Sequence, residues 1–137
     1  MTLWITMTHL QARMGEPSLL QHYQEVYRPD AQGYQEMTAA LGDISAYAGQ
    51  HGIRLYLAIV PDIHDLEHYQ LGFAHQQVAA LAERLGYRTI DLLPAFGKRP
   101  PQDVWAMPGD PHPNALGQAI MADAMAPLLY APFEVNR

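Results

Sequence analysis

The chain contains no cysteine, only two serines and few basic residues, and each shortage excludes a class of chemistry. Without cysteine there are no disulfides, thiolate metal ligands or cysteine nucleophiles. The 8 Lys and Arg residues are scattered and face 14 Asp and Glu, which gives a formal net charge of -6. Because nucleic-acid binding needs a basic patch, we do not expect it. No run approaches the roughly 20 apolar residues of a membrane span.

The N-terminus lacks the features of a secretion signal. It has no basic start, no sufficiently long apolar core and no small-residue cleavage site, so the sequence as written predicts a cytoplasmic protein. We expect residues 1–137 to form a single domain, small for a complete α/β hydrolase. Residues 1–32 read as an N-terminal helical arm, in which Ser18 and Gln21 have the spacing of a capping box.

The middle of the chain alternates helical and strand patterns. Apolar residues step by three and four from Gly33 to Gly52, and a nearly unbroken apolar run follows from Ile53 to Val60, before Pro61. A second helical stripe from Ala74 to Leu85 precedes a second strand pattern from Tyr87 to Leu93. This order predicts an α/β fold with parallel strands that helices cover on both faces.

The last third of the chain combines a long connection with a helix. Residues 94–113 read as a loop of about 20 residues, which is longer than ordinary connections and therefore of functional interest. An apolar helix then begins at Ala115, with Asn114 as its cap, and we expect Pro127 to stop or kink it.

Asp110 and His112 are the main candidate catalytic residues. They lie on either side of Pro111, in a loop that Pro108 and Pro113 also stiffen. A carboxylate beside an imidazole fixes its tautomer, so that the other ring nitrogen can take a proton from a hydroxyl. We therefore predict that Asp110 orients the ring and that His112 acts as general base.

The residues Asp110, His112, Pro113, Asn114 and Gly117 resemble the last conserved block of the SGNH (GDSL-type) ester hydrolases. In that block an Asp and a His precede Pro-Asn, two further residues, a Gly and a C-terminal helix. The commonest spacing puts two residues between the Asp and the His. This chain has one, as in a shorter variant of some acyl-transfer relatives.

The order of elements from about residue 34 to residue 129 also resembles the C-terminal half of a bacterial SGNH hydrolase. The resemblance implies a flavodoxin-like three-layer fold without cofactor or metal. It also implies hydrolysis or transfer of the acyl group of a small-molecule ester through an acyl-serine, with His112 as base and Asp110 as its orienting group.

The family's nucleophile block, Gly-Asp-Ser after the first strand, and its oxyanion-hole Gly and Asn are not visible here. The two serines do not replace them, because Ser45 follows Gly42-Asp43-Ile44 inside a predicted helix and Ser18 reads as a cap. We therefore expect this chain alone to be inactive or incomplete. Two parallel strands also leave sheet edges unpaired, which predicts a homo-oligomer or a companion N-terminal half. The alternative is a non-catalytic remnant that serves as a binding or assembly module.

The segment His64-Asp65-Leu66-Glu67-His68 offers a rival chemistry. It fits the H-x-x-E-H pattern, in which two His on a helix hold zinc and the Glu activates water. A third ligand is also needed, and the only Glu far downstream is Glu134. In the other interpretation this is a polar loop at the carboxyl end of a strand, where open α/β sheets bind ligands. Asp62, His64 and His68 then line the substrate entrance without binding metal, and the substrate-binding candidates of the chain are Asp62, His64 and Trp105. No role is predicted for His9, His22, His51 and His75.

Overall fold

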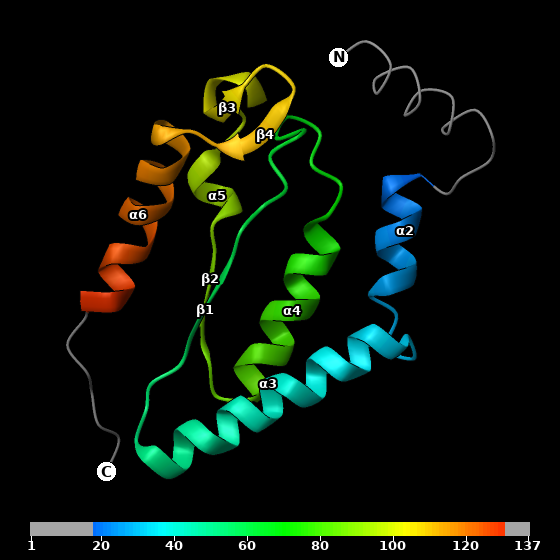
Figure 1. Ribbon diagram of the computed structural model, residues 1–137, viewed down its shortest axis with the longest axis vertical. Helices are drawn as coiled ribbons and strands as arrows, with labels where there is room; N and C mark the ends of the chain where they lie inside the picture. The colour runs from blue at the N-terminus through cyan, green and yellow to red at the C-terminus, as the bar shows by residue number, and fades with distance from the viewer. Residues whose placement is uncertain (1–17, 131–137) are drawn as a thin grey trace.

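The computed structural model describes residues 18–130 as a mixed α/β fold, which confirms the predicted class. Residues 1–17 of the predicted arm and Glu134 lie outside the described residues. The elements in chain order (Figure 1) are α2 (Leu19–Val26), α3 (Gln32–His51), β1 (Tyr56–Ile59), α4 (Gly72–Arg84), β2 (Arg88–Asp91), α5 (Leu93–Phe96), the 3-10 helix η1 (Pro101–Val104), β3 (Trp105–Met107), β4 (Asp110–Pro113) and α6 (Ala115–Tyr130). No helix in this part of the chain has the length and apolar character needed to cross a membrane.

Strands β1 and β2 pair in parallel, as predicted, with Tyr56 opposite Arg88. Both are shorter than predicted, and Ile53 and Val60 are 51% and 53% exposed. The prediction of a first strand covered on both faces is wrong, because the side chain of Ala58 in β1 is exposed. The physical reason is that β1 has β2 as its single partner within residues 18–130, so only a short stretch of backbone is paired.

Helix α4 packs against both strands, and the strand pair lies between α4 and α6 (Figure 1). The main core sits beyond the carboxyl ends of the strands, where the loop after β1, α5, η1 and α6 meet. Its buried members are Ile63, Leu66, Leu92, Phe96, Val104 and Met121. The core therefore anchors the segments that follow β1 and β2, where open α/β sheets place ligand sites.

Local signals set the helix ends. The Ser18 and Gln21 capping box is present at α2, as predicted, and Gly52 ends α3 with φ 64°, a left-handed conformation that glycine adopts without strain. Pro127 does not stop α6, which continues to Tyr130, so that part of the prediction is wrong. Proline removes only one internal hydrogen bond here, close to the end of the helix.

Residues 94–113 do not form the predicted loop. The segment contains the end of α5, then η1, and an antiparallel hairpin of β3 and β4, which turns at Gly109 with φ 83°. Phe96 and Val104 are fully buried, so this segment folds back onto the core instead of crossing the surface. The prediction missed this because the buried positions are too few to show a period. As a result, Asp110 and His112 lie on a strand.

Candidate functional site

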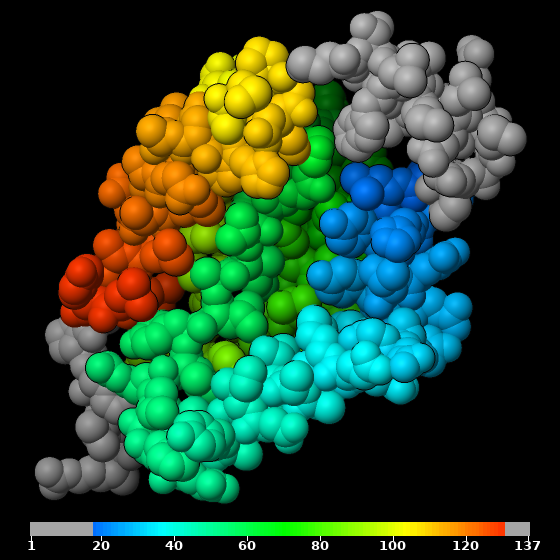
Figure 2. Space-filling model, in the orientation of Figure 1, coloured from blue at the N-terminus to red at the C-terminus, as the bar shows by residue number. Residues whose placement is uncertain are grey.

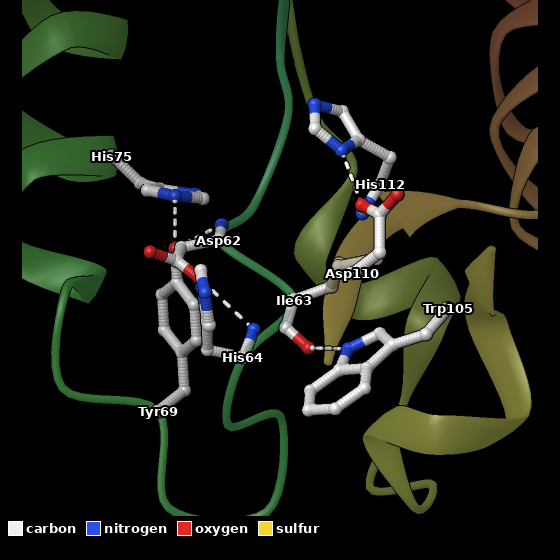
Figure 3. Close-up of polar contacts among 8 residues, drawn as sticks. All are labelled: Asp62, Ile63, His64, Tyr69, His75, Trp105, Asp110 and His112. Carbon is white, nitrogen blue, oxygen red and sulfur yellow. Dashed lines mark hydrogen bonds and ion pairs between the residues drawn. The ribbon is translucent and has the colours of Figure 1, made fainter. Parts of the chain in front are cut away.

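Asp110 and His112 form a hydrogen-bonded pair on β4, as the sequence predicted (Figure 3). The Asp110 carboxylate accepts from the His112 ring at Nδ1 and from the His112 backbone N–H at 3.0 Å. The ring hydrogen bond, together with the backbone one, lowers the pKa of the Asp110 carboxyl below its usual 3.8. The His112 side chain is 85% exposed. The pair thus holds Nδ1–H toward the carboxylate and leaves Nε2 for proton transfer.

The residues that follow His112 fix the hairpin on α6. The Asn114 side chain accepts from the Gly117 N–H at 3.0 Å, which confirms its predicted capping role, and donates to Asp103 O at 2.9 Å. Gly117 is needed for close packing, because a Cβ there would lie 3.0 Å from Pro113 Cβ and 3.4 Å from Val104 O. The Pro-Asn-x-x-Gly string therefore has a physical reason: it joins the strand that carries His112 to the helix behind it.

Asp62 and His64 have the same local geometry as Asp110 and His112. The Asp62 carboxylate accepts from His64 Nδ1 at 2.5 Å and from the His64 backbone N–H at 2.9 Å. In both cases one residue separates the two partners, so one carboxylate oxygen reaches the backbone and the ring together. Asp62 and His64 are substrate-binding candidates from the sequence, and the structure shows in addition that they form a second Asp-His pair, which was not predicted.

Trp105 links the hairpin that carries Asp110 and His112 to the loop that carries Asp62 and His64. Its indole N–H donates to Ile63 O at 2.7 Å, and its ring meets the His64 ring at 6.3 Å in an edge-on contact (Figure 3). In Figure 2 the yellow hairpin lies beside the green segment that follows β1, in agreement with this hydrogen bond. The substrate-binding role of Trp105 stays a prediction, and its indole N–H is engaged with the loop.

A partly buried hydrogen-bond network, centred on the buried His75, adjoins the loop that carries Asp62. The Tyr69 hydroxyl donates to His75 Nε2 at 2.7 Å and accepts from the Asp62 N–H at 3.2 Å. His75 Nδ1 donates to the Asp91 carboxylate at 2.8 Å, and Asp91 also accepts from the Leu93 N–H. Burial raises the pKa of the Tyr69 hydroxyl to about 12. The network ties the ends of β1 and β2 to α4.

Sequence reasoning gave His75 no role, although the structure makes it the centre of this network. It is 6% exposed and lies beside the apolar positions of α4. A buried histidine with both ring nitrogens bonded is a satisfied polar group of the kind that protein interiors require. In the sequence, His75 shows only as a polar residue next to the apolar positions of the helix. That position does not indicate that Tyr69 and Asp91 are its hydrogen-bond partners.

The helix that the zinc motif requires is absent. Between β1 and α4 the chain forms bends and turns, so His64 and His68 do not stand at helical spacing. His64 is bonded to Asp62, and His68 Nδ1 lies 3.6 Å from Asp65. Within residues 18–130 no group of three or more His, Cys, Asp or Glu side chains is arranged to hold a metal ion. The rival prediction of a helical zinc site is therefore wrong.

The two serines lie in different surroundings. The Ser45 hydroxyl donates to Leu85 O at 2.5 Å, before β2 begins and thus at the end of the sheet opposite to β4. The Ser18 side chain accepts from the Gln21 N–H at 3.2 Å as the cap of α2. Neither serine hydrogen-bonds to His112. The Asp110 and His112 pair on β4 therefore has no serine partner in the described part of the chain.

Comparison of the chain with protein-family models, curated proteins and solved structures finds no match. The resemblance to SGNH hydrolases accordingly rests on the residues of the Asp110 to Gly117 block and on the order of the elements.

Proposed function

We propose that this chain is the C-terminal, acid-base part of an SGNH-type ester hydrolase or acyltransferase with a flavodoxin-like three-layer fold. The observation that carries the proposal is the Asp110 and His112 pair, which the Pro-Asn-x-x-Gly string holds against α6. In the proposed reaction, His112 Nε2 takes a proton from a hydroxyl whose oxygen attacks the acyl carbonyl. The imidazolium, which the Asp110 carboxylate stabilises, then protonates the leaving alcohol.

The nucleophile in this proposal comes from a companion N-terminal segment or from a second copy of the chain. The high exposure of His112 leaves room for such a partner. A groove of about 360 Å³ runs along four consecutive residues, Leu57 to Val60, and Tyr23 of α2 and Tyr27, the C-cap of that helix, form part of its wall. Because β1 has one partner strand in the described residues, its other edge offers unpaired backbone groups to an added strand.

The acid-base role of His112 can be tested without the missing nucleophile, by supplying a small alcohol. The purified chain is mixed with p-nitrophenyl acetate and methanol, and methyl acetate is quantified by NMR above the protein-free rate. Methanol can reach the exposed Nε2, lose its proton there and attack the acetyl carbonyl while p-nitrophenolate leaves. We expect His112→Gln and Asp110→Asn each to lower this protein-dependent rate at least about tenfold.

His51→Gln is the matched control, since His51 is also exposed and its ring Nδ1 is also hydrogen-bonded, to Tyr47 O at 2.8 Å. It should leave methyl acetate formation unchanged, and circular dichroism should show all variants folded. A folded chain whose methanolysis is equal in wild type and His112→Gln would contradict the proposed base. That result would favour the alternative, a non-catalytic remnant that acts as a binding or assembly module.

A further inference from the structure

A cavity of about 280 Å³ lies between the start of α2 and the loop after β1. Its lining includes Ser18, Asp62 and His64, which supply a hydroxyl, a carboxylate and an imidazole. Leu19 and Leu71 line it as well, so the polar groups stand beside apolar walls. Asp110 and His112 do not belong to this lining. The cavity is therefore separate from the pair on β4.

Asp62 is held in place from two sides. Its backbone N–H donates to the Tyr69 hydroxyl at 3.2 Å, and its carboxylate accepts from His64 Nδ1 at 2.5 Å. The Asp62 side chain is only 21% exposed, whereas the His64 ring is open to solvent. With Nδ1–H on the carboxylate, His64 Nε2 is the nitrogen that can accept a proton. No hydrogen bond of this Nε2 occurs within residues 18–130.

Ser18 keeps its hydroxyl proton available in spite of its capping role. Its Oγ accepts from the Gln21 N–H at 3.2 Å, and this bond uses one oxygen lone pair. The hydroxyl hydrogen remains free to be donated. Ser18 and His64 are not hydrogen-bonded to each other in this structure, although they line the same cavity. In ligand-free enzymes the catalytic hydrogen bonds are often long and tighten only when substrate binds.

We infer that Ser18, His64 and Asp62 form an acyl-transfer site for short-chain acyl esters, in addition to and independent of the pair on β4. Ser18 Oγ bonds to the acyl carbon while its proton passes to His64 Nε2. The ester C–O bond then breaks, and the leaving alcohol takes that proton. Water subsequently attacks the acyl-serine, His64 accepts a water proton, and the acid leaves as Ser18 regains its hydrogen. Leu19 and Leu71 would contact the acyl chain.

The test is covalent labelling of the purified chain with an alkyl fluorophosphonate. In this reaction the Ser18 oxygen bonds to phosphorus, fluoride leaves, and the proton passes to His64. Peptide mapping by mass spectrometry locates the label, and intact-mass measurements against time give its rate. We expect the label on Ser18, and we expect His64→Gln and Asp62→Asn to slow labelling about 100-fold.

Matched variants distinguish the proposed role of Ser18 as nucleophile from its role as the cap of α2. Ser18→Asn retains a good helix cap but has no hydroxyl, so it should fold normally and lose the label. Ser45→Ala should label like wild type. Two outcomes would overturn the inference: no label on Ser18 of the folded chain, or labelling of Ser18 at an unchanged rate in His64→Gln. The methanol assay that tests His112 is run in the Ser18→Asn background, so that acyl transfer from Ser18 cannot contribute to methyl acetate formation.

Discussion

Replacing Tyr69 with Phe removes one hydroxyl from the hydrogen-bond network around the buried His75 and leaves the ring in place. His75 Nε2 then loses its 2.7 Å donor, and at 6% exposure the residue has almost no access to water as a substitute. An unsatisfied buried acceptor costs about 1–3 kcal/mol, and the lost bond from Asp62 N–H adds about 0.5–1.5 kcal/mol. Removing the phenol also removes its own desolvation cost. We expect Tyr69→Phe to lower the free energy of unfolding by about 2 kcal/mol.

Urea unfolding followed by circular dichroism measures this loss as a shift of the midpoint. Tyr130→Phe is the control, because Tyr130 is 85% exposed; its change should stay within about 0.5 kcal/mol. In a His75→Leu background the acceptor is already absent, so Tyr69→Phe should cost less there by about 1 kcal/mol. If Tyr69→Phe is as mild as Tyr130→Phe, the network does not hold the loop.

The same hydroxyl gives the network a pH limit. Burial raises the pKa of Tyr69 from 10.0 to about 12, so the folded state favours the protonated form more than the unfolded state does. The resulting stabilisation is fully present below pH 10.0 and is lost as the pH rises through about 12. The difference between the ultraviolet titrations of wild type and Tyr69→Phe should therefore show a phenol that ionises near pH 12.

Three further predictions concern the block that carries His112. The pKa of Asp110 is lowered below 3.8, so the stabilisation from its hydrogen bonds to His112 is present above pH 3.8 and is lost as the pH falls through the lowered pKa. NMR of the Asp110 carboxyl carbon should give a titration midpoint below 3.8, and His112→Ala should move that midpoint back toward 3.8. Gly117→Ala puts a Cβ 3.0 Å from a rigid proline carbon and should destabilise by about 1 kcal/mol in urea unfolding, whereas Gly42→Ala, in an open helical position, should stabilise by about 0.5–1 kcal/mol. Asn114→Ala should cost about 1 kcal/mol by the same measurement, and Asn114→Ser, which keeps a capping oxygen, should cost less.

Local chemistry determined much of this protein from the sequence alone. Ser18 and Gln21 cap α2 because their spacing lets each side chain reach the other's backbone N–H, and Asn114 caps α6 in a similar way. Periodicity located α3, α4 and the parallel strands. The Asp110 and His112 pair was predictable because residues two apart in a stiff segment reach each other without help from the rest of the fold.

Only the tertiary structure decided what depends on contacts between distant segments. It folded residues 94–113 into a hairpin on the core, brought His75 between Tyr69 and Asp91, and separated Ser45 from His112. It also placed Ser18 in one cavity with Asp62 and His64, although two helices and a strand separate them in the chain. Such contacts depend on which surfaces of the helices and strands pack together. The spacing of residues along the sequence predicts contacts only between residues a few positions apart.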